Sequence, residues 1–532
     1  MTRRAAGLLA SLLLACGAET LRAQGEAVMS SPAAPTPTLI VLVTIDQFRA
    51  DYLTRFGPQL HGGLARLTRG GAWFTDAHHD HAITETAPGH ATLLAGRFPR
   101  STGITMNSVG VADNGSPLIA DGYGPGASPK RFAGSTLVDW LHAKDARSRA
   151  LSVSLKDRGA ILPVGRSRSE VYWYSADGRF LTSRYYRETL PDWVNAFNER
   201  HLPQRYAGRS WTLLLPDSAY HERDSVMAEA GGVEIAFPHP LPEDSVDAAS
   251  LVRATPFIDE ITVAFALHGI EALGLGRGPQ TDLLAVSLSA TDYVGHRFGP
   301  DSREIHDQVL RDDRTIGVLL DSIFRMRDSS RVVVVLTSDH GVGTIPEVAA
   351  ASTAPRATRV DLYPLMPALR ARLRAANLDT LSMEIDQQLF LVDRASVQKA
   401  PEKADSIVSW FGAEARKVAG VRRVDRFRAL LADSLHDPIA RRWSHQLPAN
   451  VQVELVVTLD SLSTWGGNVA SHGSSYPHDS HVPVIFYGMG IRPGRYGDFV
   501  RTVDIAPTLA AVAGVKPTER LDGVVLRDAL LH

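Results

Sequence analysis

Residues 39–46 read Leu-Ile-Val-Leu-Val-Thr-Ile-Asp, a run of apolar and β-branched residues that ends in an aspartate. Such a run, bounded by Pro37 and Asp46, predicts a strand that is buried on both faces of a parallel sheet. Runs of the same kind follow at residues 283–289, 332–337 and 482–487. Between the second and third runs, residues 305–328 carry apolar side chains at helical spacing, which indicates a βαβ unit. The sequence therefore predicts an α/β fold with a doubly wound, mostly parallel central sheet flanked by helices.

Two regions interrupt this pattern. Residues 165–260 and 345–465 contain Trp, Tyr and Pro-rich turns, and alternating stretches such as residues 451–457. We interpret both as inserted cap or accessory regions. The core is then expected to comprise residues 39–164, 261–344 and 466–532.

The composition excludes several classes of protein. The chain has 532 residues, of which 44% are hydrophobic, enough for a sizeable core. Its 56 Lys and Arg nearly balance 58 Asp and Glu, which argues against a nucleic-acid-binding module. The one cysteine, Cys16, excludes a disulfide scaffold, a zinc finger and an Fe–S protein.

The first 24 residues resemble a signal peptide. Two arginines precede an apolar run at residues 5–15, which is too short to span a bilayer because a spanning helix needs ~20 residues. The stretch Leu13-Leu-Ala-Cys16 resembles a bacterial lipobox, and cleavage near residues 21–23 is the alternative. Residues 25–38, rich in Pro and Ser, follow as a tether. Both routes predict an exported protein, either periplasmic or lipid-anchored to the cell envelope.

Metal-type side chains lie next to each predicted strand. In open α/β sheets, ligands bind outside the carboxyl ends of the strands, so these side chains should converge there. Carboxylates and imidazoles together suit Zn²⁺ or a similar ion. The pattern therefore predicts a dinuclear metal site formed by Asp46, Asp292, His296, Asp339, His340 and His472.

A nucleophile candidate lies in the stretch Thr84-Glu-Thr86-Ala-Pro88-Gly-His90. Pro88 is typical of a first helical turn, so Thr86 is expected at a helix N-terminus. Thr86 could simply assist in capping that helix. Alternatively, the backbone N–H groups there could hold an anion, and a metal ion could activate the Thr86 hydroxyl.

These motifs occur together in a recognisable order. They are Asp46, Thr86-Ala-Pro-Gly-His90, Gly103-Ile-Thr-Met-Asn107, Asp292-x-x-x-His296, Asp339-His340-Gly and His472-Gly. The set resembles the alkaline phosphatase superfamily, in its type I phosphodiesterase/nucleotide pyrophosphatase branch. Within that branch it is most similar to the phosphate-irrepressible (PafA-type) alkaline phosphatases, which use Thr as the nucleophile. The resemblance extends from residue 46 to residue 472.

The resemblance implies a role for each residue. It implies that Asn107 donates a hydrogen bond to a phosphoryl oxygen. His478 and His481 are alternatives to His472, which we prefer because Gly follows it directly. The implied ligands are Asp292, His296 and His472 for one zinc, and Asp46, Asp339, His340 and the Thr86 oxygen for the other.

Lys156 and Arg158 bear on the type of substrate. They follow a predicted strand at residues 149–155, and taken alone they would suggest a solvated turn. The resemblance implies instead that both contact the substrate phosphate. A phosphate monoester reacts as a dianion, and cations on its oxygens stabilise the transition state. The pair therefore favours monoesters over diesters.

Two other features that contain histidine are not expected to bind the metal ions. The run His78-His-Asp-His81 resembles a metal cluster but matches no ligand position of the family. His90 should lie one helical turn after Thr86, facing the buried side rather than the metals.

The residues and the resemblance together predict an exported zinc-dependent phosphate monoester hydrolase, an alkaline phosphatase. It would hold two Zn²⁺ per chain and form a phosphothreonine intermediate at Thr86. Its partners would be small-molecule phosphate monoesters and not nucleic acid, with membrane contact only through a lipid on Cys16. A phosphodiesterase or nucleotide pyrophosphatase on the same core stays open, as does a non-catalytic metal- or phosphate-binding protein.

Overall fold

The computed structural model describes residues 35–119 and 124–531. The predicted signal peptide at residues 1–24, including Cys16, and residues 25–34 of the predicted tether lie outside the described residues. Among the described helices, none is both long and apolar enough to cross a membrane.

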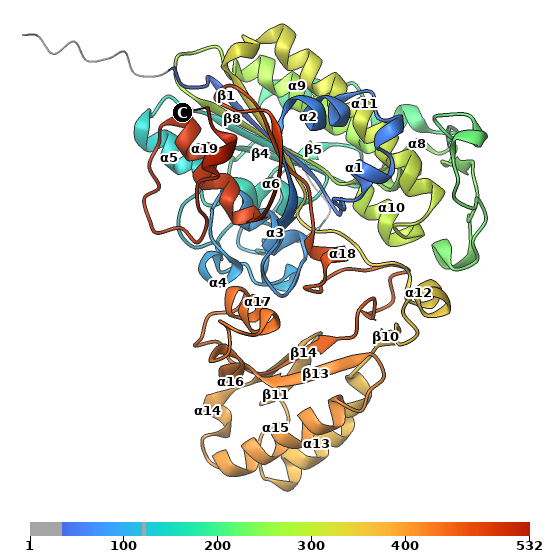
Figure 1. Ribbon diagram of the computed structural model, residues 1–532, viewed down its shortest axis with the longest axis vertical. Helices are drawn as coiled ribbons and strands as arrows, with labels where there is room; N and C mark the ends of the chain where they lie inside the picture. Colours follow the sequence, from blue (N-terminus) through green and yellow to red (C-terminus); the bar gives the residue numbers. More distant parts are fainter. Residues whose placement is uncertain (1–34, 120–123, 532) are drawn as a thin grey trace, which may run out of the picture. The chain divides into compact units, whose positions relative to one another are not determined.

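A nine-stranded sheet forms the centre of the described chain (Figure 1). Its strand order is β17-β2-β16-β9-β1-β8-β3-β4-β5. The strands span Leu39–Ile45 (β1), Ala72–His78 (β2), Ala150–Ser154 (β3), Glu170–Tyr174 (β4), Phe180–Leu181 (β5), Asp282–Leu288 (β8), Val332–Thr337 (β9), Val484–Gly488 (β16) and Gly494–Arg501 (β17).

The middle of the sheet is parallel, as the apolar runs predict. β1 lies between β8 and β9, is parallel to both, and every residue of the three strands is buried. Thr44 pairs with Ser287 on one side and Thr337 on the other, so the three strands end at the same level. The residues that follow them therefore emerge at one edge of the sheet.

The fourth apolar run differs from the expectation of a parallel strand. β16 is antiparallel to both β9 and β2, and Val484 pairs with Thr337. β16 consequently begins at the edge where β1, β8 and β9 end. This reversal brings the residues before β16, including His472, to the carboxyl edge of the parallel strands.

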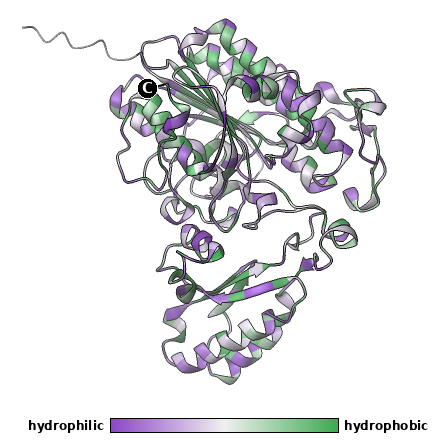
Figure 2. Ribbon diagram, in the orientation of Figure 1, coloured by the Kyte–Doolittle hydropathy of each residue, from purple (hydrophilic) through white to green (hydrophobic). Residues whose placement is uncertain are grey.

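Helices cover both faces of the sheet. Val41 and Val43 of β1 pack in one hydrophobic cluster, and Ile40 and Leu42 in another, because successive strand residues point to opposite faces. The first cluster includes residues of α2 (Gly63–Gly70), α9 (Phe257–Leu273) and α11 (Arg303–Met326), among other helices. The second includes residues of α3 (Thr86–Leu93), α5 (Leu137–Lys144), α6 (Asp157–Ile161) and α19 (Ile505–Ala513). The doubly wound α/β class is confirmed, and Figure 2 shows hydrophobic residues along the strands of the central sheet and on the helices beside it.

The range 345–465 forms a second layer, which we call the cap. Its larger sheet has four antiparallel strands in the order β11-β12-β14-β13. They span Met383–Asp386 (β11), Leu389–Val392 (β12), Val421–Arg426 (β13) and Val453–Leu459 (β14). Helices α13 (Met366–Ala375) and α15 (Pro401–Ala415) pack on this sheet through Leu369, Leu373, Phe411 and their neighbours. The cap therefore has a hydrophobic core of its own.

The other expected insertion, residues 165–260, does not lie wholly outside the core. β4 pairs with β3 in parallel, and β5 pairs with β4, so both extend the central sheet. The remainder of this range consists of short helices and the two-stranded pair β6 (Ser210–Trp211) and β7 (His239–Pro240). The sequence pattern misses β4 and β5 because each is short and aromatic rather than a long aliphatic run.

Candidate active site

Three buried aspartates meet at the carboxyl edge of the central strands. Asp46 directly follows β1, Asp339 follows β9 after one residue, and Asp292 lies in the first turn of α10 (Ala290–Phe298), just after β8. Asp46 and Asp339 are completely buried and Asp292 nearly so. The common level at which the three strands end accounts for this convergence.

Gln47 joins two of these carboxylates, and sequence reasoning missed it. Its backbone N–H donates to Asp339 Oδ1 (3.1 Å), and its side-chain amide donates to Asp292 Oδ1 (2.9 Å). Gln47 adopts φ 65°, a left-handed conformation that is uncommon for a non-glycine residue. Its position directly after Asp46 was the available signal, because a glutamine alone carries no chemistry that suggests a site.

Three imidazoles surround the carboxylates. His296 Nε2 lies 3.3 Å and His472 Nε2 lies 3.8 Å from Asp292 Oδ1. His340 Nε2 lies 3.5 Å from both Asp46 Oδ1 and Asp339 Oδ2. The rings of His340 and His472 are stacked with their centroids 3.7 Å apart.

Backbone carbonyls orient all three rings in the same way. Nδ1 lies 2.8 Å from Ala470 O in His296, 2.9 Å from Gly341 O in His340, and 2.8 Å from Thr84 O in His472. A carbonyl oxygen can only accept, so each Nδ1 donates to it and each Nε2 is turned towards the carboxylates. Metal-ligating histidines typically have this outer hydrogen bond.

Burial and neighbouring charges set the protonation of the group. Burial lowers the pKa of His340 and of His472, so both rings are neutral and can offer a lone pair. Burial alone would raise the pKa of Asp292, but Lys156 and His296 outweigh it and hold that pKa well below its usual value. Burial and the charge of Asp339 raise the pKa of Asp46.

This donor set fits divalent metal ions. Ligand atoms of Asp46, Asp339 and His340 lie within 4.8 Å of one another, and so do those of Asp292, His340 and His472. Asp46 Oδ1 is buried and accepts no hydrogen bond from the described residues. Buried carboxylates and neutral imidazoles in this arrangement are typical zinc ligands.

Thr86 begins helix α3 beside this group. Its side-chain oxygen lies 3.4 Å from His340 Nε2, and the residue is almost completely buried. A Cβ atom added to Gly89 would lie 2.2 Å from Asp339 O, so only glycine lets the helix approach this closely. Gly89 therefore has a structural reason: it lets the start of α3 lie against the residues that follow β9.

His90 faces the buried side, as expected, and it also contacts a candidate ligand, which was not predicted. Its ring is completely buried, and Nδ1 lies 2.9 Å from Thr86 O and 3.1 Å from Asp339 Oδ2. Nε2 lies 2.9 Å from the Ser287 hydroxyl. His90 thus links the nucleophile candidate, Asp339 and β8, which the spacing from Thr86 alone did not reveal.

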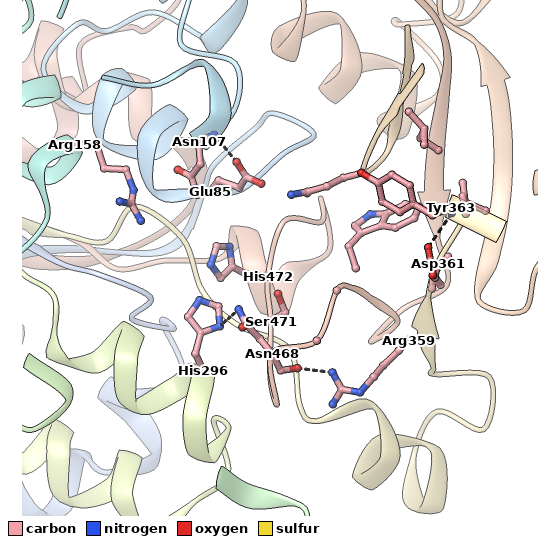
Figure 3. Close-up of a pocket in the computed structure, with 17 residues that line it drawn as sticks. Glu85, Asn107, Arg158, His296, Arg359, Asp361, Tyr363, Asn468, Ser471 and His472 are labelled. Carbon is pink, nitrogen blue, oxygen red and sulfur yellow. Dashed lines mark hydrogen bonds between the residues drawn. The ribbon is translucent and has the colours of Figure 1, made fainter. Parts of the chain in front are cut away.

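Asn107 lies beside the N-terminus of α3. Its side-chain oxygen accepts a hydrogen bond from Ala87 N (2.9 Å), which leaves the side-chain NH₂ to donate elsewhere. Its backbone N–H donates to Glu85 (2.6 Å), whose pKa is raised by burial. Glu85 was not predicted from the sequence. Asn107, Glu85 and Arg158 line the adjoining cavity (Figure 3).

Lys156 and Arg158 take different positions. Lys156 Nζ lies 2.7 Å from Asp46 Oδ2 and 2.6 Å from Asp292 Oδ2, among the predicted metal ligands. Arg158 lines the cavity, and the charged neighbour that its guanidinium approaches at 3.7 Å is Asp157. The two cations that the sequence grouped together thus serve different parts of the site.

The remaining histidine candidates lie apart from this group. The His78–His81 run is divided: His78 contacts Asp76, His79 contacts Ser338 O and Thr502, and Asp80 pairs with Arg441. His481 stacks on His78, and His478 stacks on Tyr476. Of the three alternatives for the last ligand, the structure brings His472 next to Asp292.

A buried acid pair supports helix α10 from behind. Asp259 Oδ1 accepts hydrogen bonds from Ser289 N (3.0 Å) and Ala290 N (3.2 Å), at the start of the helix that carries Asp292 and His296. Asp312 hydrogen-bonds to Asp259 and to the Thr291 hydroxyl (2.8 Å). Burial raises the pKa of Asp259 to about 7. Sequence reasoning missed this pair because neither residue adjoins a motif.

We expect Asp259→Asn to flatten the pH dependence of stability. The folded-state pKa of Asp259 is raised, so protonated Asp259 stabilises the folded state. This contribution to the free energy of unfolding is present in full below the ordinary pKa of 3.8 and is lost as the pH rises through about 7. Asparagine cannot ionise, so the free energy of unfolding should fall less between pH 5 and pH 8 than in the wild type. Urea denaturation at both pH values measures this, and an unchanged fall would contradict it.

The cavity beside the metal-type residues has a volume of about 760 Å³. The core end of the cavity is lined by His296, His472, Asn107, Glu85 and Arg158. Residues 359–363, 385, 387 and 465–468, from the cap and its connections, line the other end. Figure 3 shows His296 and His472 lying between Arg158 on one side and Tyr363 on the other.

The sequence is similar to a known protein family and to alkaline phosphatases from bacteria. The family model of type I phosphodiesterase/nucleotide pyrophosphatase matches residues 40–377. Alkaline phosphatase PafA of Elizabethkingia meningoseptica is 29% identical over 509 residues, which cover 91% of this chain and 93% of the relative. Alkaline phosphatase PhoV of Synechococcus elongatus is 30% identical over 526 residues, covering 93% of each chain.

The structure has a close counterpart among solved structures. The crystal structure of alkaline phosphatase PafA superposes with a TM-score of 0.85 at 27% sequence identity. The match covers 94% of this chain and 100% of that chain. The similarity therefore includes the cap as well as the central sheet.

Proposed function

The chain belongs to the type I phosphodiesterase/nucleotide pyrophosphatase family, in its alkaline phosphatase branch, and we propose that Thr86 is its nucleophile at a centre of two zinc ions. It is a phosphoric monoester hydrolase that acts on small-molecule phosphate esters. One observation carries the proposal: the Thr86 hydroxyl, three buried carboxylates and three oriented imidazoles lie in one group.

We propose the same two sets of zinc ligands that the sequence resemblance implies. One ion would be held by Asp292, His296 and His472, and the other by Asp46, Asp339, His340 and the Thr86 oxygen. When bound, zinc ions supply positive charge that lowers the pKa of the Thr86 hydroxyl and stabilises the leaving oxygen.

Thr86 attacks phosphorus in line with the leaving oxygen. The Thr86 hydroxyl gives up its proton to solvent as its oxygen forms a bond to phosphorus. The bond from phosphorus to the ester oxygen breaks, and the released alkoxide takes up a proton from solvent. Water then attacks the phosphothreonine, which releases phosphate and restores the hydroxyl. Two in-line displacements retain the configuration at phosphorus.

The phosphoryl oxygens need donors beyond the metal ligands. The Asn107 NH₂ and the Arg158 guanidinium face the cavity and would bind two of these oxygens. Lys156 Nζ lies within hydrogen-bond distance of Asp46 and Asp292. Because the Lys156 side chain is flexible, we propose that its ammonium group also binds a phosphoryl oxygen next to these two carboxylates. These cations suit a dianionic monoester, because a diester carries one charge fewer.

We expect a large preference for monoesters, and we expect Arg158 to contribute to it. The value of kcat/KM should be higher for p-nitrophenyl phosphate than for bis(p-nitrophenyl) phosphate. Arg158→Ala should lower the monoester value about a hundredfold, as for loss of one charge-stabilising donor, and the diester value much less. Arg168→Ala, which removes an exposed arginine stacked on Tyr185, is the matched control.

A preference for the diester that Lys156→Ala and Arg158→Ala leave unchanged would contradict this assignment. That outcome would instead favour a phosphodiesterase or nucleotide pyrophosphatase on the same core.

We also propose that the enzyme acts outside the cytoplasm, either periplasmic or anchored through a lipid on Cys16, on the basis of its N-terminal sequence.

A further inference from the structure

The cavity is larger than a phosphoryl group requires. Its volume of about 760 Å³ lies within the range of ~300–1,000 Å³ that is typical of pockets for drug-sized ligands. The groups proposed to bind phosphate lie at the core end, whereas the remaining volume extends along the cap. The cap end is therefore available to the ester group of a substrate.

Two aromatic residues form part of this cap wall. β10 (Arg359–Val360) pairs in parallel with β15 (Thr464–Trp465), which brings Tyr363 and Trp465 to the same end of the cavity. Trp465 packs against the hydrophobic core of the cap, so the position of its ring is fixed. Tyr363 is 62% exposed and is not needed to fill a core.

The space next to these rings is open. After Trp465 come Gly466 and Gly467, and a Cβ atom added to either would meet no heavy atom within 4 Å. Both glycines line the cavity. A flat ring lying on the aromatic residues would therefore meet no obstruction from this loop.

The charges at the cap end oppose a second phosphate. Among the described residues lining this end, the single cationic side chain is Arg359. It is already engaged, by Glu347 (2.7 and 3.0 Å) and by Val469 O (2.8 Å). Asp361, whose carboxylate accepts a hydrogen bond from Tyr363 N, adds a negative charge. Gln387 and Asn468 supply neutral donors and acceptors.

We propose that the cap wall is a subsite for a flat, uncharged ring in the ester group, stacked on Tyr363 and Trp465. The inference rests on the proposed function, because it assumes that the phosphate lies at the core end. It assigns the substrate class as monophosphate esters that bear such a ring, and it disfavours esters that carry a further phosphate.

Adenosine 5′-monophosphate and ribose 5-phosphate provide the test. Both release the same ribose 5′-oxygen, and they differ by the presence of the base. For the wild type we expect kcat/KM to be about tenfold higher for the nucleotide, the effect of one stacked base. Adenosine diphosphate should be a poorer substrate than the monophosphate.

Variants of the two rings make the test specific. Tyr363→Ala and Trp465→Ala should each lower kcat/KM for the nucleotide about fivefold to tenfold, and change that for ribose 5-phosphate less than twofold. Tyr363→Phe, which keeps the ring, should retain the wild-type ratio. Phe499→Ala, which removes an aromatic residue on β17 that is 47% exposed and does not line the cavity, is the control.

The outcomes distinguish the subsite from the proposed function. Equal kcat/KM for the two sugar phosphates, or variants that lower both equally, would overturn the subsite while the hydrolase assignment stands. Hydrolysis of neither, and of no other monoester, would overturn the proposed function and this inference with it. Because Tyr363 is mostly exposed, Tyr363→Ala should fold normally even if Trp465→Ala does not.

Discussion

Thr86→Ala is expected to lower kcat/KM for p-nitrophenyl phosphate by at least about a thousandfold, or ~4 kcal/mol of transition-state stabilisation. The hydroxyl oxygen that forms the bond to phosphorus is removed, and alanine offers no replacement. The backbone at the start of α3 should persist, because Gly89 still allows its close contact with Asp339. The loss should therefore appear in kcat, with the fold intact.

Two comparisons make this result specific to Thr86. Thr92→Ala changes another buried threonine of α3, whose hydroxyl donates to Gly89 O (2.7 Å), and should retain activity. Thr86→Ser should retain part of it, because serine keeps a hydroxyl at the same position. Near wild-type turnover by Thr86→Ala, with purity established by mass spectrometry, would rule out Thr86 as the nucleophile.

Removal of metal ions is the second change with a very large expected effect. Prolonged treatment with a chelator should lower activity by at least about a thousandfold, because the nucleophile is then an un-ionised hydroxyl. Three buried carboxylates would be left with Lys156 as the cation among them, so the melting temperature should also fall. Zn²⁺ added back should restore both activity and melting temperature.

Histidine variants supply the control for metal removal. His472→Gln should lower the bound metal and the activity, because His472 Nε2 faces Asp292. His268→Gln changes a histidine of α9 whose Nε2 lies 3.0 Å from Trp193 O, outside the group, and should lower neither. Full activity of the chelated wild-type protein, with no metal found by elemental analysis, would contradict the proposed mechanism.

The central sheet could be predicted from the sequence because its strands are buried on both faces. The aliphatic run at residues 39–45 coincides with β1, and the run at residues 332–337 coincides with β9. The direction of β16 could not be predicted in this way, since an aliphatic run looks the same whether it pairs parallel or antiparallel. β4 and β5 were missed because aromatic residues in short strands give no long apolar run.

The predicted metal ligands and nucleophile have chemistry that can be recognised in a sequence, and the structure brings them together. The residues that orient them were missed, because their role comes from position. Gln47 bridges two carboxylates through a backbone N–H and an amide, and Asp259 caps a helix from another element. Helical spacing from Thr86 correctly placed His90 on the buried side. It gave no information about the residues after β9, so the contact between His90 and Asp339 was not predicted. Lys156 was grouped with Arg158 because the two are close in sequence, but its ammonium group contacts the carboxylates of Asp46 and Asp292.

The central claim is that these residues bind two divalent cations beside Thr86. An anomalous-difference map from crystals of the zinc-loaded enzyme, recorded at the zinc absorption edge, tests it most directly. We predict two peaks, one among Asp292, His296 and His472 and the other among Asp46, Asp339 and His340, next to the Thr86 oxygen. A map with no peak at these side chains, from crystals of active enzyme, would contradict the account.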